Sequence, residues 1–110
     1  MLIDHRTYTC RPGTIKRHLA LYAEKGYETQ SKHLGKPLLY ATTETGDPNS
    51  YVHIWVYKDA ADRETRRKAM AADPAWQEFL RLSAEKGYLV SQSNKLLVPV
   101  DFAPEPLTAD

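Results

Sequence analysis

The clearest pattern of hydrophobic and polar positions is a pair of strand-like runs separated by a polar turn. Residues 38–45 are rich in β-branched and aromatic side chains, and residues 51–57, with the sequence YVHIWVY, are richer still. Residues 46–50, with the sequence GDPNS, supply the turn between them. The pattern therefore predicts an antiparallel hairpin, and Asp59 is placed to begin a helix just after it.

The second run of the hairpin is non-polar on both faces. Because side chains alternate across a strand, one face is aliphatic and carries Val52, Ile54 and Val56. The other face carries His53 and Trp55 between two tyrosines. We expect the aliphatic face to pack against helices and the aromatic face to be bare in a single chain. A bare face of this kind indicates an interface or a ligand site.

The remaining segments alternate between strand and helix patterns. The predicted elements outside the hairpin are a strand over 2–10, a helix over 14–25, a helix over 60–72, a further helix from Asp73-Pro74 to Gly87, and a strand over 89–98. The polar segment 27–37 fits either an extension of the first helix or a loop. On the last helix, Trp76 and Phe79 share one face, so we expect both in the core.

A short internal repeat supports two similar halves. Residues 19–27 (LALYAEKGY) and 80–88 (LRLSAEKGY) each stand at the end of a predicted helix. The order is then a ferredoxin-like βαββαβ fold of the α+β class, with an antiparallel four-stranded sheet and its helices on one face. We expect one domain over 1–100 and an extended, proline-containing tail over 101–110. Two chains that set their sheets face to face would form a dimeric α+β barrel.

Composition restricts the classes of partner. The 110 residues carry a formal net charge of +1, which favours neither nucleic acid nor a membrane surface as a partner. No apolar run approaches the roughly 18 residues of a membrane span. Cys10 is the one cysteine, and the first residues lack a signal-peptide pattern, so we expect a cytoplasmic protein.

The order of several motifs resembles the NIPSNAP family over residues 1–104. The motifs are YTCRPG at 8–13, HLGKPLLY at 33–40, VHIWVY at 52–57, ADRETRR at 61–67, DPAW at 73–76 and SQSNKLL at 91–97. The resemblance implies a dimeric α+β barrel, a superfamily that includes antibiotic-biosynthesis-type monooxygenases, haem-degrading monooxygenases and isomerases. It implies no particular reaction.

The polar and aromatic strand residues are the best candidates for a binding site. The four histidines lack the spacing of metal ligands, so we expect no metal and no cofactor. A cavity for a small organic molecule is instead expected inside the dimer. Its candidate lining residues are Arg6, Tyr8, His33, Tyr40, His53, Trp55, Gln92 and Asn94.

Three alternatives to simple binding stay open. The same side chains would also fit a plain dimer interface whose polar groups satisfy one another. By analogy with the superfamily, they would fit a cofactor-independent monooxygenase or isomerase, in which His53 or His33 is the base and Arg6 or Tyr8 holds an oxyanion. A third possibility is a non-catalytic interaction module that uses its dimer surface and the tail.

Overall fold

A computed structural model of the chain describes residues 1–106. It contains four strands and four helices in the order β1 (Leu2–Cys10), α1 (Ile15–Lys25), α2 (Tyr27–Leu34), β2 (Leu39–Thr42), β3 (Ser50–Tyr57), α3 (Ala60–Ala72), α4 (Pro74–Lys86) and β4 (Leu89–Leu97). The segment left open by the sequence is therefore helical as far as Leu34. Residues 107–110 of the predicted tail lie outside the described residues.

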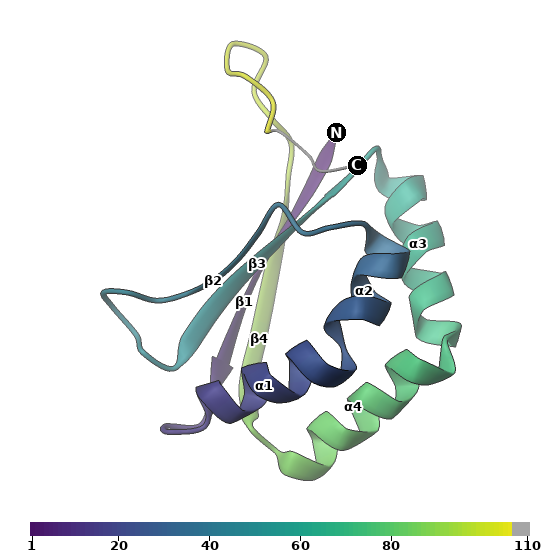
Figure 1. Ribbon diagram of the computed structural model, residues 1–110. Helices are drawn as coiled ribbons and strands as arrows, with labels where there is room; N and C mark the ends of the chain where they lie inside the picture. The colour runs from purple at the N-terminus through teal and green to yellow at the C-terminus, as the bar shows by residue number, and fades with distance from the viewer. Residues whose placement is uncertain (107–110) are drawn as a thin grey trace.

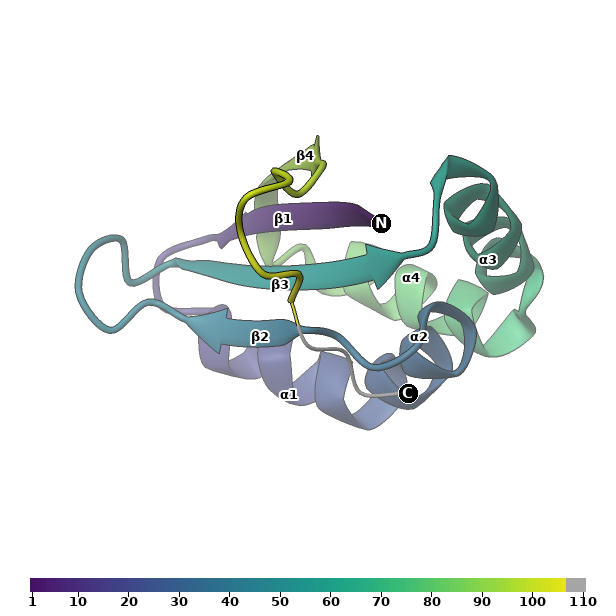
Figure 2. The ribbon, with the colours of Figure 1, turned by 90° about the horizontal axis from the view of Figure 1, so that it is seen from above.

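The four strands form one antiparallel sheet in the order β2-β3-β1-β4. This is the ferredoxin-like arrangement, so the predicted fold class is confirmed. All four helices lie on one side of the sheet (Figures 1 and 2). In the register of the sheet, Arg6 of β1 stands between His53 of β3 and Asn94 of β4, and Tyr40 of β2 stands beyond His53. None of the helices within residues 1–106 has the length and apolar character that a membrane crossing requires.

Local signals in the sequence set the ends of α3 and α4. The Asp59 carboxylate accepts a hydrogen bond from the backbone N–H of Asp62 over 2.8 Å and caps α3. Asp73 caps α4 in the same way, and Pro74 follows at the first helical position. Gly87 ends α4 with a φ of 64°, a left-handed conformation that favours glycine.

The prediction of which sheet face packs against the helices is wrong. On β3 the aromatic face is buried, and Trp55 has no exposed surface. Val52, Ile54 and Val56 are only half-buried and lie on the open face of the sheet, away from the helices. The reason is that the helices themselves contribute large aromatic side chains, so the space between the layers is filled by rings from both sides.

The core between the layers is mainly aromatic. Its buried members are Tyr22, Leu34, Trp55, Tyr57, Met70, Trp76 and Phe79, and Tyr40 packs against them. The predicted core positions of Trp76 and Phe79 are confirmed. β4 stands at the edge of the sheet, and every residue of it after Leu89 is exposed. The helix layer therefore leaves the side of the core next to β4 open.

Candidate functional site

A pocket of about 460 Å³ lies between the sheet and the helix layer, within a single chain. Its volume is in the range of small-molecule sites, roughly 300–1,000 Å³. The sheet contributes Arg6, Tyr8, Tyr40, Tyr51, His53 and Gln92 to the lining. The helices contribute His18, Tyr22, Gln30, Arg67, Trp76 and Phe79 among others. The expectation that the candidate residues face a partner's sheet is wrong, because these side chains point toward the chain's own helices.

Five of the eight candidate residues line the pocket, and the other three lie outside its lining. Arg6, Tyr8, Tyr40, His53 and Gln92 line the pocket. Trp55 is fully buried beside His53 and donates a hydrogen bond to it. Asn94 is bound to the Asp4 carboxylate, and His33 is bound to Asp73, the cap of α4. His33 therefore has a structural role at the meeting of two helices.

The pocket residues that come from the helices were not predicted as site residues from the sequence. His18 and Tyr22 are one helical turn apart on α1, and both are buried against the sheet. The spacing of four residues places both side chains on one face of the helix. Such spacing does not show whether that face lines a pocket or packs in the core. Trp76 and Phe79, expected only in the core, also form part of the wall.

Stacked aromatic rings form one wall of the pocket. The rings of Tyr22 and Tyr40 are stacked with centroids 4.9 Å apart, and those of Tyr40 and His53 with centroids 4.8 Å apart. The Tyr8 ring meets His53 edge to face at 4.7 Å. Rings stacked on one another in this way form a rigid aromatic wall, which suits an aromatic guest.

The buried phenols stay protonated. Burial raises the pKa of Tyr22, Tyr40 and Tyr51 well above the ordinary value, and the neighbouring phenols raise it further for Tyr22 and Tyr40. Tyr22 donates its hydroxyl hydrogen to Gln30 over 2.5 Å. Tyr51 and the Nε2 atom of His18 are hydrogen-bonded over 2.7 Å. These three tyrosines are thus neutral, and they contribute hydroxyl groups rather than charges to the pocket wall.

His53 is a neutral imidazole whose tautomer is set by its neighbour. The indole N–H of Trp55 donates to Nδ1 of His53 over 2.7 Å, so Nδ1 carries the lone pair and the proton lies on Nε2. Burial, and then the charge of Arg6, lowers the pKa of His53 to about 3. The Nε2 atom is buried and has no hydrogen-bond partner among the described residues. Imidazole at this position is a hydrogen-bond donor and cannot accept a proton at Nε2.

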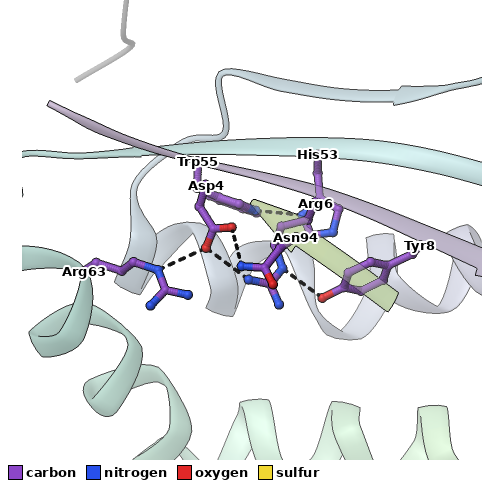
Figure 3. A network of polar contacts seen from close by, with 7 residues as sticks. All are labelled: Asp4, Arg6, Tyr8, His53, Trp55, Arg63 and Asn94. Atoms are coloured by element: carbon purple, nitrogen blue, oxygen red, sulfur yellow. Dashed lines mark hydrogen bonds and ion pairs between the residues drawn. The ribbon is translucent and has the colours of Figure 1, made fainter. Parts of the chain in front are cut away.

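A charged network borders the pocket on the β1 side (Figure 3). The Asp4 carboxylate is fully buried and accepts hydrogen bonds from Arg6 over 3.0 Å, from Arg63 over 3.1 Å and from Asn94 over 3.1 Å. Burial alone would raise the pKa of Asp4, but Arg6, Asn94 and Arg63 together lower it below its usual value. One carboxylate therefore stands between two guanidinium groups, which leaves a net positive charge beside the pocket.

Arg6 connects this network to the aromatic wall. Its Nε atom donates to the Tyr8 hydroxyl over 3.2 Å, and its Nη1 atom donates to Asp4. Its side chain keeps about 13% of its surface exposed, in contrast to the fully buried Asp4. The guanidinium therefore reaches the open side of the pocket.

A larger hollow of about 740 Å³ lies at another place, between the ends of α2 and β3. It is lined by surface residues that include Lys36, Lys58, Arg66 and Glu105. It holds none of the candidate residues, so we place the candidate site in the smaller, aromatic pocket. Among residues 1–106, no three histidine, cysteine, aspartate or glutamate side chains are arranged to hold a metal ion.

The sequence and fold comparisons place the chain in a family. The NIPSNAP family model matches residues 3–104. The chain belongs to the NIPSNAP family. It is 30% identical over 95 residues to a NipSnap homologue of Dictyostelium discoideum, and 31% identical over 75 residues to human NipSnap homologue 3A. These alignments cover 86% and 68% of this chain but only 41% and 30% of the two relatives, so this NIPSNAP chain corresponds to less than half of each.

Solved structures of NIPSNAP proteins share the whole fold. The Agrobacterium tumefaciens protein Atu4242 has a TM-score of 0.86 and 35% identity, covering 94% of this chain and 98% of that one. An uncharacterised NIPSNAP domain protein from Burkholderia xenovorans has a TM-score of 0.87 and 32% identity, covering 96% and 100%. An antibiotic biosynthesis monooxygenase is similar in fold alone, with a TM-score of 0.62 at 22% identity, covering 91% and 99%.

The geometry limits what this NIPSNAP site can do chemically. Cys10 lies outside the lining of the pocket, and burial raises the pKa of its thiol, which makes it a poor nucleophile. The phenols are neutral and His53 is a donor. The pocket is therefore suited to holding a planar molecule through stacking, hydrogen-bond donation and one exposed positive charge.

Proposed function

We propose that this NIPSNAP protein binds a small organic molecule in the pocket between its sheet and its helices. The observation that carries the proposal is the pocket itself: a 460 Å³ hollow at the edge of an aromatic core, lined by stacked rings and by polar side chains. Much of the lining is aromatic or aliphatic, so an organic molecule that replaces water in this open pocket buries non-polar surface, which is favourable.

Binding can be tested with a pair of matched variants on α4. Ala84 lines the pocket and is exposed at its rim, whereas Ala75 is exposed on the same helix and lines none of the described pockets. One- and two-ring aromatic molecules, neutral and anionic, are titrated into the protein while the fluorescence of Trp55 and Trp76 is followed. We expect saturable binding by wild type and by Ala75→Phe, and at least tenfold weaker binding by Ala84→Phe. Absence of binding across the panel contradicts the proposal.

We also propose a cytoplasmic homodimer that forms through the open face of the sheet. That face carries Ile3, Val52, Ile54 and Val56, which are only half-buried in one chain, and Leu39, which is exposed. A non-polar face next to an exposed edge strand is a common basis for association. Cys10 as a single buried thiol is in keeping with a reducing compartment.

A cofactor-independent monooxygenase or isomerase is the second candidate function. It is favoured by two neutral imidazoles, His18 and His53, in one pocket. The role of His53 would differ from the one expected, because its tautomer makes it a donor to an oxyanion and not a base. His33 is removed from the pocket by its bond to Asp73. Turnover of catechols or quinols above background by wild type, lost in Ala84→Phe, would support catalysis, and equal background rates would contradict it.

A further inference from the structure

We propose that the bound molecule is a planar, conjugated oxyanion, such as an aromatic carboxylate, a phenolate or an enolate, whose oxygen is held by the Nε2–H of His53 and the guanidinium of Arg6. This inference rests on the proposed function and specifies its ligand. It follows from the tautomer of His53, from its missing partner, from the free capacity of Arg6 and from the shape of the pocket.

The first step is the direction of the hydrogen bond at His53. Indole nitrogen is only a donor, so the 2.7 Å contact from Trp55 requires a lone pair on Nδ1 of His53. A neutral imidazole then carries its proton on Nε2. Trp55 has no exposed surface, so water does not compete for this contact. His53 is one of the residues that line the pocket, so a fixed N–H donor stands in the pocket wall, in the middle of β3.

The second step is that this donor lacks a partner. His53 is 1% exposed, and its Nε2 atom makes no hydrogen bond among residues 1–106. A buried donor left without an acceptor is costly, and most such groups in proteins are satisfied. The ring neighbours of His53 are aromatic, with Tyr8 edge to face and Tyr40 stacked. An acceptor atom on a ligand would satisfy the donor.

The third step is the charge beside it. Arg6 is the cross-strand neighbour of His53 on the same face of the sheet, where opposed side chains are about 5 Å apart at Cβ. Arg6 donates to Asp4 and Tyr8 through Nη1 and Nε (Figure 3). Its Nη2 atom makes no hydrogen bond among residues 1–106. Asp4 carries one negative charge, and its two partners, Arg6 and Arg63, carry one positive charge each. The remaining positive charge favours an acceptor that carries a negative charge.

The fourth step is the shape of the pocket. Tyr40 is stacked on both Tyr22 and His53, so this wall is a rigid aromatic surface. Trp76 and Phe79 line the pocket from α4. A volume of about 460 Å³ accommodates a molecule of one or two rings. A conjugated oxyanion satisfies both the aromatic lining and the two donors.

The test compares two probes of equal shape and different charge, 2-naphthoate and 2-naphthamide, by isothermal titration calorimetry. We expect wild type to bind the carboxylate at least tenfold more tightly than the amide. His53→Gln places an amide N–H near the position of Nε2 and should lose less than threefold in affinity for 2-naphthoate. His53→Phe and Arg6→Met should each lose at least tenfold for 2-naphthoate and clearly less for 2-naphthamide, whose carbonyl oxygen accepts the same hydrogen bonds without a charge.

Controls separate a lost donor from a lost fold. His53→Phe leaves the Trp55 N–H without an acceptor, so the double variant with His53→Phe and Trp55→Phe removes both partners together, and circular dichroism checks its fold. In the wild-type protein, the ¹⁵N resonance of the protonated Nε2 should move when 2-naphthoate is added. A proton found on Nδ1, or an Nε2–H signal that stays unchanged because the donor points only at the Tyr8 ring, overturns the inference.

The outcomes also distinguish this inference from the proposed function. If both probes bind equally and Ala84→Phe weakens both, the pocket binds small molecules but the oxyanion assignment is wrong. If neither these probes nor the neutral members of the panel bind, the proposed function fails and the ligand assignment fails with it.

Discussion

The Nε1–H of Trp55 donates to Nδ1 of His53 across 2.7 Å, between two side chains that are two residues apart on one face of β3. The contact is buried, so it determines both the tautomer and the orientation of the imidazole. It connects the core of the protein, where Trp55 packs, to the pocket that His53 lines.

A double-mutant cycle on this pair should show coupling. Trp55→Phe and His53→Phe each leave one buried polar group without its partner, which typically costs about 1–3 kcal/mol of unfolding free energy. The double variant removes both groups, so its destabilisation should be smaller than the sum by about 1 kcal/mol. Urea unfolding followed by circular dichroism measures all four proteins. Strict additivity would show that the hydrogen bond contributes nothing to stability.

Asp4→Asn should be strongly destabilising. The substitution leaves Arg6 and Arg63 without their shared carboxylate in a buried position, and removal of one partner from a buried ion pair costs about 3–5 kcal/mol. Glu64→Gln is the control, because its pair with Lys68 on α3 is exposed and contributes less than about 1 kcal/mol. Chemical denaturation of both variants near neutral pH makes the comparison. If Asp4→Asn lowers the unfolding free energy no more than Glu64→Gln does, the Asp4 network does not stabilise the fold.

Stability should fall as the pH is lowered toward 5. The pKa of His53 is about 3 in the folded protein, against an ordinary value of 6.5 that applies to the unfolded chain. Between these two pH values the unfolded chain therefore binds one more proton than the folded protein. The stabilisation is complete above about pH 6.5 and is lost as the pH falls through the window, by roughly 2 kcal/mol between pH 7 and pH 5. Burial lowers the pKa of His18 too and adds in the same direction.

The charged neighbours of His53 do not titrate over the same range. Arg6 stays protonated, because its pKa is raised above the ordinary value, and the pKa of Asp4 is lowered below its ordinary value of 3.8. The unfolding free energies of wild type and His53→Gln, measured by denaturation at several pH values, should therefore change differently with pH. The free energy of the variant should depend less on pH. Parallel curves would show that His53 is protonated to the same extent in both states.

A charge on the open face should prevent the proposed dimer. Ile54 lies between two buried residues of β3 and points away from the helices, so Ile54→Lys places an ammonium group in the proposed interface. Light scattering should give about twice the 12.5 kDa of one chain for wild type and for the helix-surface control Ala69→Lys, and 12.5 kDa for Ile54→Lys. The variant should still bind in the pocket, which lies within one chain. A wild-type mass of 12.5 kDa would rule the dimer out.

Two glycines should respond to alanine for different reasons. At Gly26, a Cβ atom would lie 2.8 Å from the Tyr22 ring and 3.2 Å from Phe79, so crowding should cost about 1–3 kcal/mol and disturb the pocket wall. At Gly87, nothing lies within 4 Å, and only the φ of 64° opposes a side chain, at a cost of about 1 kcal/mol. Gly87 itself lines the pocket, so probe binding is compared only between wild type and Gly26→Ala, which should bind more weakly. Thermal unfolding of both variants should show the larger loss of stability for Gly26→Ala.

Part of the site could be predicted from the sequence, because alternation along a strand assigns side chains to a common face. Arg6 and Tyr8 share a face of β1, as His53 and Trp55 share a face of β3, and the structure brings the two faces together. His33 could not be placed in this way. Its segment was ambiguous, and its bond to Asp73 joins residues 40 positions apart. The contribution of His18 depends in the same way on how α1 packs over the sheet.

The sequence by itself determined the elements other than α2, their order and the family of this protein, since these depend on local periodicity, capping residues and the order of motifs. Only the tertiary structure decided which face of the sheet meets the helices. Alternation along the strand shows that Val52 and Ile54 share one face and that His53 and Trp55 share the other. It does not show which of the two faces packs against the helices. The choice depends on how the ring volumes of Tyr22, Trp76 and Phe79 fill the space between the layers, and on whether buried polar atoms such as the Trp55 N–H find partners there.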